Sequence, residues 1–336
     1  VVVTAPIVVT FSEGMDTATV TWTFTPLATV NPSWSGGDTV LTLQPSPSLA
    51  ECTLYTVLIA GDDKSGVPLA GGPVPNPWSF TTVCTVLPVG GLQIQRVLPN
   101  DIRLAWNAVP NADAYRVYDA PDKFAGPWTM RLETTALQFQ APDLTDGNTH
   151  YYLVRAVRAG REGPNSTMAA KIELSIGYNP LGTNVYFFSL PYRSEYTRAS
   201  DIANDLGPGQ IDVVARWNAA TQSPQLYYYF RGQWRGTNFP INPGDGLYIG
   251  SVSAFTWRIV GTDRGLTLSF TANAPPIGNV NWVSVPYGGA YRNARDLVVH
   301  IEGHAGPGSN TKIVEVGKWN PATQTEHFVR RAAFAT

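Results

Sequence analysis

The sequence predicts a mostly β protein, in which serial antiparallel sandwiches are followed by two β-rich repeats that each carry a short helix. Short runs of alternating apolar and polar residues recur along the chain, and this is the period of a strand with one buried face. The 336 residues include 31 Gly and 27 Pro, which end strands in tight turns. A third observation is a sequence pattern that occurs twice in the second half.

Composition limits the classes of partner. Lys and Arg number 23 against 25 Asp and Glu, the net charge is −2, and charged residues make up only 14% of the chain. No basic run is present to replace phosphate counterions, so we expect no nucleic-acid partner. No stretch of about 18 apolar residues occurs, so we expect no membrane span in this chain, and the N-terminus shows no export signal of its own.

We assign the first module to residues 1–86. Its alternating runs are rich in Val, Thr and aromatic residues and are bounded by Pro and Gly, as is typical of an antiparallel sandwich. The runs lie at 7–11, 20–24, 39–43, 55–59 and 78–82.

The order of landmarks in this module resembles a known family. The landmarks are APIVVTFSEGMD at 5–16, LQP at 43–45, Leu49, YTV at 55–57, DKSG at 63–66 and WSFTT at 78–82. Nearly the whole module resembles the bacterial Ig-like domain of S-layer and other cell-surface proteins. The resemblance implies a prokaryotic protein that is extracellular or at the cell surface. The family pattern begins with one additional strand, so we expect the first module to lack its opening strand.

Both cysteines lie in the first module, Cys52 just before the run at 55–59 and Cys84 just after the run at 78–82. Antiparallel pairing of these runs would bring the sulfurs opposite each other, so we predict a disulfide; two free buried thiols are the alternative. Closing a loop of about 30 residues contributes on the order of 3 kcal/mol. A disulfide also indicates an oxidising compartment. Neither cysteine lies in a Cys-x-x-Cys motif, so no metal or catalytic role is expected.

Residues 87–175 predict a second sandwich. Its strands are IRLAW at 102–106, AYRVY at 114–118 and YYLVRAV at 151–157, which place a Trp and several Tyr in one core. This order resembles a fibronectin type III domain over nearly its full length. The resemblance implies a spacer or binding module without revealing a ligand. It also implies a corner at Leu144 where Tyr151 or Tyr152 donates a hydroxyl hydrogen bond.

The second half contains a tandem repeat. NVYFFSLPY at 184–192 matches NVNWVSVPY at 279–287, and RWNAATQ at 216–222 matches KWNPATQ at 318–324. We assign copy 1 to residues 176–272 and copy 2 to residues 273–336.

Each copy predicts a short helix, at 199–206 in copy 1 and at 294–301 in copy 2. Extra residues in copy 2 are expected around His304. Copy 2 has no counterpart of 235–260, so we expect it to be incomplete at its C-terminus. Together with the Pro-Gly-x-Gly motif at 243–246 and the aromatic Tyr248 that follows it, the pattern is similar to an uncharacterised β-rich repeat of secreted bacterial and archaeal proteins, to which no chemistry is attached.

Aromatic residues in copy 1 are candidates for stacking on sugars. Because a strand alternates its faces, Tyr227 and Tyr229 share one face and Tyr228 and Phe230 the other, and either pair can be the exposed one. With Trp234, the residues Tyr227 and Tyr229 form the candidate sugar-stacking set.

Four carboxylates in loops are candidate calcium ligands, since calcium prefers oxygen. They are Asp62, Asp63, Asp143 and Asp146. Turn formation is the alternative, because Asp bonds its own backbone in turns. No other cofactor or metal is expected, although His300 and His304 have the spacing of two ligands on one helix face.

The sequence predicts no enzyme, because it contains no Gly-x-Ser-x-Gly motif and its carboxylates are sparse. We predict a non-enzymatic extracellular structural or adhesive protein: a stalk, an S-layer-like protein or a fibre subunit that assembles head-to-tail by strand complementation. The expected partners are further copies of itself, other cell-envelope proteins or polysaccharide. The alternative is the accessory carbohydrate-binding region of a secreted hydrolase. The open ends are also explained if the chain is a segment of a longer protein.

Overall fold

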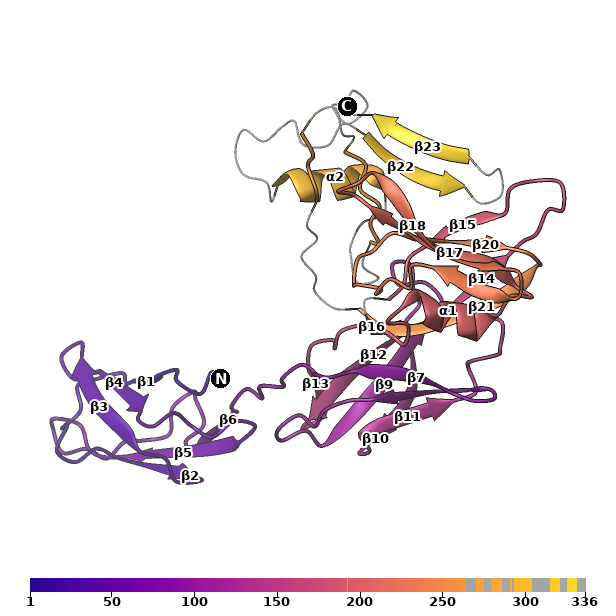
Figure 1. Cartoon of the computed structure of the whole chain (residues 1–336). Coiled ribbons are helices and arrows are strands. Elements are labelled where there is room, and N and C mark those ends of the chain that lie inside the picture. Colours follow the sequence, from indigo (N-terminus) through magenta and orange to yellow (C-terminus); the bar gives the residue numbers. More distant parts are fainter. Residues whose placement is uncertain are drawn as a thin grey trace. The chain divides into compact units, whose positions relative to one another are not determined.

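The computed structural model describes residues 1–191, 193–263, 270–274, 279–285, 291, 293–303, 315–320 and 325–330. Within these residues the protein is mostly β with two short helices, as predicted (Figure 1). The chain divides into two compact units. The first is Val1–Leu87 with Val157–Gly163, and the second is Pro88–Ala156 with Pro164–Thr336.

The first unit contains a sandwich of two three-stranded antiparallel sheets, with strand orders β1-β4-β3 and β2-β5-β6. Its strands are β1 (Ile7–Thr10), β2 (Thr21–Thr25), β3 (Val30–Ser35), β4 (Val40–Pro45), β5 (Leu54–Ala60) and β6 (Trp78–Thr81). All five predicted runs are strands. Alternation directs Tyr55, Val57 and Ile59 of β5 into the core. Strand β3 was not predicted; it lies at a sheet edge, where Pro32 and its missing N–H are tolerated.

The next segment forms the sandwich that the fibronectin type III resemblance implies. One sheet has the order β11-β8-β7 and the other contains β10-β9-β12-β14. The strands are β7 (Gln93–Val97), β8 (Asp101–Ala105), β9 (Ala114–Ala120), β10 (Thr129–Thr134), β11 (Gln138–Ala141), β12 (His150–Arg158), β13 (Arg161–Glu162) and β14 (Ala169–Ile176). Trp106 packs on Tyr115 in the core. At the predicted corner Leu144 is buried, and Tyr152 is the hydroxyl donor, with the Asp143 carboxylate as its acceptor at 2.8 Å.

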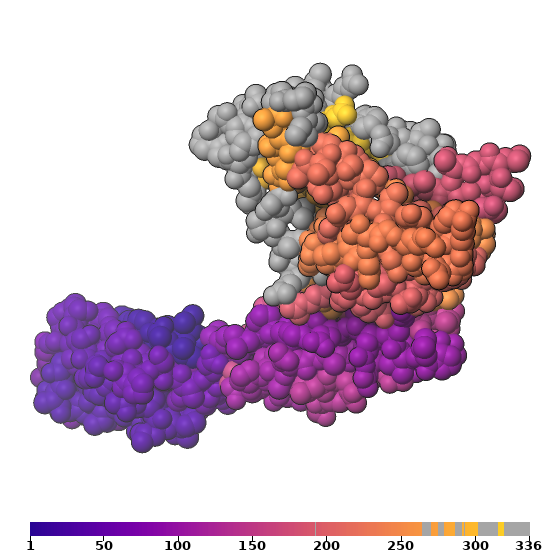
Figure 2. All heavy atoms as spheres, in the orientation of Figure 1, coloured from indigo at the N-terminus to yellow at the C-terminus, as the bar shows by residue number. Residues whose placement is uncertain are grey.

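The sheet of this second sandwich continues into copy 1. Strand β21 (Phe255–Thr262) pairs antiparallel with the whole of β14, from Ala169 opposite Thr262 to Ile176 opposite Phe255, and β16 (Arg193–Ser194) follows it. In Figure 2 the magenta atoms of the sandwich and the orange atoms of copy 1 lie against one another. The predicted boundary at residue 175 therefore falls within a strand, and the segments on its two sides share one sheet.

Copy 1 adds a second, five-stranded sheet with the order β15-β20-β17-β18-β19. Its elements are β15 (Val185–Phe188), α1 (Ala199–Leu206), β17 (Ile211–Asn218), β18 (Ser223–Phe230), β19 (Gln233–Gly236) and β20 (Leu247–Ser251). Helix α1 occupies the predicted residues. Asp201 fixes its start by accepting the backbone N–H of Arg198 at 2.9 Å. The helix ends at Gly207, whose φ of 76° favours glycine.

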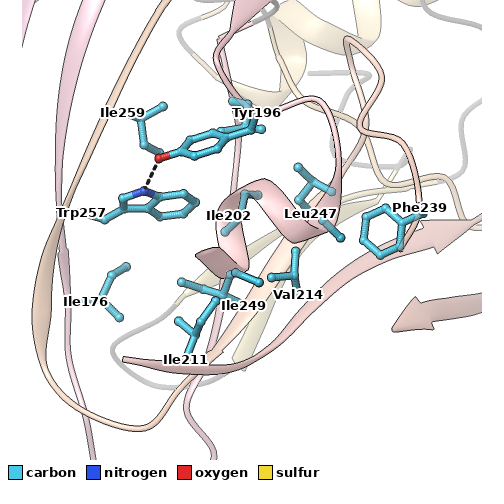
Figure 3. Packing of buried hydrophobic residues seen from close by; sticks show 13 residues of the cluster. Ile176, Tyr196, Ile202, Ile211, Val214, Phe239, Leu247, Ile249, Trp257 and Ile259 are labelled. Atoms are coloured by element: carbon cyan, nitrogen blue, oxygen red, sulfur yellow. Dashed lines mark hydrogen bonds between the residues drawn. The ribbon is translucent and has the colours of Figure 1, made fainter. Parts of the chain in front are cut away.

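The core of copy 1 lies between α1, the five-stranded sheet and the β14–β21 pair. Trp257 of β21 is almost completely buried, and its indole N–H donates to the Tyr196 hydroxyl at 3.0 Å (Figure 3). Ile202 of α1 packs into the same core, and so does Ile176 of β14. A strand of the preceding sandwich thus supplies part of the core of copy 1.

The described part of copy 2 contains α2 (Ala294–Gly303) and an antiparallel hairpin of β22 (Glu315–Asn320) and β23 (Thr325–Arg330). The predicted helix at 294–301 is confirmed and extends to Gly303. His304, where extra residues were expected, lies outside the described residues. The C-terminal residues 331–336, at which copy 2 was expected to be incomplete, lie outside them as well.

Candidate functional site

The predicted disulfide between Cys52 and Cys84 is present in the first unit. Strands β5 and β6 pair with Leu54 opposite Thr81, so their continuations run side by side. The backbone N–H of Cys52 donates to the Val83 carbonyl. The antiparallel pairing of these two strands therefore brings the two cysteines together, as expected from the sequence.

The candidate calcium ligands of the first unit lie in a turn. Asp63 is buried, and its carboxylate oxygen Oδ1 accepts the backbone N–H groups of Ser65 at 2.7 Å and Val67 at 2.8 Å. The backbone of Asp62 is bonded as well, since its N–H donates to the Thr19 hydroxyl at 2.9 Å. This geometry favours turn formation at Asp63, and calcium binding by Asp62 and Asp63 stays a prediction.

Asp143 lies among charged side chains of the second sandwich. Arg131 contacts two buried carboxylates, Asp119 at 2.6 Å and Asp143 at 3.2 Å. The His150 ring nitrogen Nδ1 lies 3.0 Å from Asp119. One ligand atom each from Asp119, Asp143 and His150 would fit around a metal ion, because these atoms all lie within 4.8 Å of one another. The Arg131 guanidinium already supplies the positive charge there, so the arrangement favours structural ion pairs over calcium.

Asp146 extends the same network to a buried lysine. Its Oδ2 lies 2.6 Å from His150 Nε2, and its Oδ1 lies 3.0 Å from the Nζ of Lys171. Lys171, on β14, is completely buried and also lies 2.6 Å from Glu173. We call Arg131, Asp119, Asp143, His150, Asp146, Lys171 and Glu173 the charged network. Sequence reasoning found only Asp143 and Asp146 in it.

The charged network predicts a loss of stability in acid. Burial alone would raise the pKa of Asp146, but hydrogen bonds from His150, Asn148 and Lys171 hold this pKa well below its usual value. A lowered pKa in the folded state stabilises the protein above the unfolded pKa of about 3.9, and this stabilisation is lost as the pH falls further. The free energy by which Asp146→Asn destabilises the chain should therefore shrink between about pH 5 and pH 2.

Urea unfolding followed across this pH range measures the effect. Glu13→Gln, at an exposed position of the first unit, controls for the general loss of charge. If the difference in unfolding free energy between wild type and Asp146→Asn stays constant down to pH 2, the pKa of this carboxyl does not change on folding.

The candidate sugar-stacking residues form a ladder on β18 and β19. The rings of Tyr227 and Trp234 stack at 5.4 Å with an interplanar angle of 13°, and Tyr229 meets Trp234 edge-on at 5.4 Å. All three are half-buried, and Tyr227 and Trp234 pack against the core. The more exposed aromatic residues are Tyr228 and Phe230, on the opposite face of β18. Sugar stacking by the three stays a prediction.

A second concentration of aromatic residues lies where the opening segment of copy 2, residues 279–285, meets copy 1. The Val280 carbonyl accepts the Trp217 indole N–H at 2.7 Å and the Gln222 amide N–H at 3.0 Å. The Val280 backbone N–H donates to the Gln222 side-chain oxygen at 2.7 Å. Two copy 1 side chains thus hold the backbone of one copy 2 residue.

Trp282 follows two residues later and packs among copy 1 rings. It stacks on Trp217 at 4.6 Å and 25°, and meets Phe187 edge-on at 4.7 Å. A Cβ on Gly246 would clash with the Trp282 Cβ, so only glycine leaves room here. We call Trp217, Gln222 and Gly246, with the copy 2 residues that they contact, the repeat junction. Sequence reasoning missed it, although Trp217 and Gln222 belong to a motif that identified the repeat, and Gly246 belongs to the Pro-Gly-x-Gly motif of copy 1.

In the part of the chain that the structure describes, neither helix has the length and apolar character needed to cross a membrane.

Comparison with known proteins assigns the first module. Residues 1–82 match the family model of the bacterial Ig-like domain, which confirms the predicted resemblance. No curated protein matches the chain.

Among solved structures, parts of the chain are similar to fibronectin type III-like proteins. An Fn3-like protein from Clostridium thermocellum is 32% identical over 24% of this chain and 86% of its own, with a TM-score of 0.23. A two-domain fibronectin type III segment of chicken tenascin is 15% identical over 44% of this chain and 78% of its own, with a TM-score of 0.27. The FN1–FN3 domains of chicken CNTN1 are 13% identical over 77% of this chain and 96% of their own, with a TM-score of 0.27.

Proposed function

We propose that this chain, whose residues 1–82 form a bacterial Ig-like domain, is a non-enzymatic structural or adhesive protein of the bacterial cell surface. Ig-like and fibronectin type III domains are typical of such proteins and generally serve as spacers or binding modules. The Cys52–Cys84 disulfide supports an extracellular location, because disulfides persist in oxidising compartments.

The pairing of β14 with β21 is the observation that carries the structural role. Eight consecutive residue pairs, from Ala169 opposite Thr262 to Ile176 opposite Phe255, join the second sandwich to copy 1. Load applied along these strands acts on many backbone hydrogen bonds at once instead of on a flexible linker. Such a connection suits a stalk or fibre subunit, in which successive modules keep a fixed spacing.

Assembly with further copies of the chain or with other cell-envelope proteins belongs to this proposal. Head-to-tail strand complementation would use sheet edges of the second unit. Among the described residues, β19 is an edge of the five-stranded sheet, and an edge strand can pair its outer backbone groups with a strand of a neighbour.

An accessory carbohydrate-binding role is the second candidate. It is favoured by the aromatic residues of β18 and β19, where Tyr228 and Phe230 are exposed next to the half-buried ladder of Tyr227, Tyr229 and Trp234. Aromatic faces of this kind can pack on the apolar faces of sugar rings. The polysaccharide would then be the ligand, and catalysis would reside elsewhere.

Antibody labelling of intact cells of the source organism tests the location, and affinity electrophoresis in gels containing cell-wall polysaccharides separates the two roles. A structural protein should label intact cells and migrate unchanged in these gels. Retardation that Tyr228→Ala or Phe230→Ala removes would favour the carbohydrate-binding role. Labelling only after lysis would overturn the surface location.

Single-molecule pulling of the full chain tests the mechanical role directly. The disulfide closes a loop with a sequence separation of 32 residues, which cannot extend while the bond is intact. Reduction should lengthen the unfolding step of the Ig-like domain by about 110 Å, at roughly 3.5 Å per residue. The Cys52→Ser/Cys84→Ser variant should show the longer step without reductant. A chain that extends smoothly, without discrete steps, would contradict the mechanical role.

A further inference from the structure

Gln222 and Trp217 recognise the backbone of the opening segment of copy 2. The Gln222 amide both donates to and accepts from Val280, which reproduces the pair of hydrogen bonds of a neighbouring strand, and Trp217 adds a third bond. Contacts of this kind fix the direction and register of an extended peptide without depending on the side chain at position 280.

Selection of a side chain occurs two residues further on. The Trp282 ring contacts the rings of Trp217 and Phe187, and the centroid of the Tyr248 ring lies 5.9 Å away. Gly246 leaves the space that the Trp282 backbone occupies. Ring pairs of this geometry stabilise a complex beyond the area that they bury. An aromatic residue is therefore favoured at this position of the bound segment.

The far end of the segment pairs with copy 1 as a strand does. Val283 forms a β-bridge with Asp245, and the Ser284 backbone N–H donates to the Gly244 carbonyl at 2.9 Å. The Ser284 hydroxyl also donates to the Asp245 carbonyl at 2.7 Å. A serine at this position adds a bond that an alanine would lack.

The contacting residues occupy repeated sequence positions. Phe187 of copy 1 corresponds to Trp282 of copy 2, and Ser189 corresponds to Ser284; Trp217 recurs as Trp319. Copy 1 uses its own opening segment differently, because Phe188 pairs with Leu247 inside the five-stranded sheet. This recurrence indicates that the opening segment of one copy is the ligand of the Trp217 and Gln222 positions of another copy.

We propose that Trp217, Gln222 and Gly246 form a peptide-recognition site on copy 1, and that its ligand is the opening segment of another repeat copy, read as aromatic-x-Ser. In this chain, residues 279–285 of copy 2 occupy the site. The site orders successive repeats and accepts the same segment from a second copy of the chain when its own is displaced. This inference goes beyond the proposed function and does not depend on where the protein is located.

A peptide-binding experiment with the full chain tests the site. The probe is a fluorescent peptide with the sequence of residues 279–285, and the variant Trp282→Ala weakens the tethered competitor. Wild type should bind the peptide poorly, because a tethered segment acts at an effective concentration on the order of 1 mM. Trp282→Ala should bind at least about tenfold more tightly than wild type. A peptide with Ala in place of Trp should lose this gain.

Two further variants make the result specific. Gly246→Ala in the Trp282→Ala background should abolish binding, because its Cβ fills the space of the peptide backbone. Tyr178→Ala in the same Trp282→Ala background, which removes an exposed ring outside the site, should leave binding as tight as in Trp282→Ala alone. A Trp282→Ala chain that melts cooperatively but binds the peptide no better than wild type would overturn the proposal.

Hydrogen exchange supplies a readout that needs no added ligand. The amides of Val280 and Ser284 should be protected in wild type, because both donate to copy 1. They should exchange at least about tenfold faster in Trp282→Ala, because the opening free energy falls by the lost ring contacts. Unchanged protection of both amides would show that the ring does not hold the segment.

Discussion

Trp257→Ala is expected to destabilise the second unit by about 3–5 kcal/mol, the usual cost of truncating a fully buried Trp to Ala. Trp257 is 1% exposed, and its ring meets Phe188 edge-on at 4.8 Å and Tyr196 at 5.8 Å. The substitution also removes the indole N–H that donates to the Tyr196 hydroxyl. A cavity and a lost hydrogen bond therefore arise together.

The damage should extend into the second sandwich. Trp257 lies opposite Leu174 of β14, and β14 pairs with β12 on its other side. Because β21 continues the sheet that contains β12 and β14, loosening it uncovers backbone groups of the sandwich. We expect amides of both β12 and β21 to lose protection in hydrogen exchange, and the second unit to unfold in one transition at a lower temperature.

Trp257→Phe is the matched control, since it keeps most of the buried ring and should retain more than half of the stability that Trp257→Ala loses. Two separate transitions, with β12 unaffected by either substitution, would show that the second sandwich and copy 1 fold independently in spite of their shared sheet.

Local sequence patterns predicted the elements that depend on local information. Period-2 alternation identified β5. Helix α1 was expected at the residues where it is observed, and it lies between Asp201 in its first turn and Gly207 after its last residue. The positions of Cys52 and Cys84 indicated their disulfide. The pairing of β14 with β21 was not predicted, because periodicity shows that a strand exists but not which distant strand lies beside it.

The candidate sites show the same division. Asp143 and Asp146 were identified as loop carboxylates that could bind calcium. A carboxylate can equally bind a cationic side chain, and the sequence does not distinguish these two partners. Their observed partners, Arg131 and Lys171, come from other strands. One signal was present in the sequence: Lys171 interrupts an otherwise apolar run at 169–172. A lysine there must either reach water or find buried carboxylates.

Lys171→Met is expected to destabilise the second unit by about 3–5 kcal/mol, because removing one member of a buried ion pair leaves the other uncompensated. Lys171 has no solvent exposure, and its Nζ contacts Asp146 at 3.0 Å, Glu173 at 2.6 Å and the Asn148 carbonyl at 2.5 Å. Methionine retains much of the packing volume, so the loss reports mainly on the charge. Urea unfolding at neutral pH measures it.

Lys64→Met is the matched control in the first unit. Lys64 lies 2.7 Å from Asp38, but its side chain is 58% exposed, so its loss should cost at most about 1 kcal/mol. Adding Glu173→Gln to Lys171→Met should restore part of the stability, because it removes a carboxylate left without its lysine. Arg258 limits the recovery, since it lies opposite Glu173 on β21 at 3.3 Å and loses its own partner. If Lys171→Met and Lys64→Met cost the same, Lys171 is hydrated in solution, and the charged network does not hold the shared sheet together.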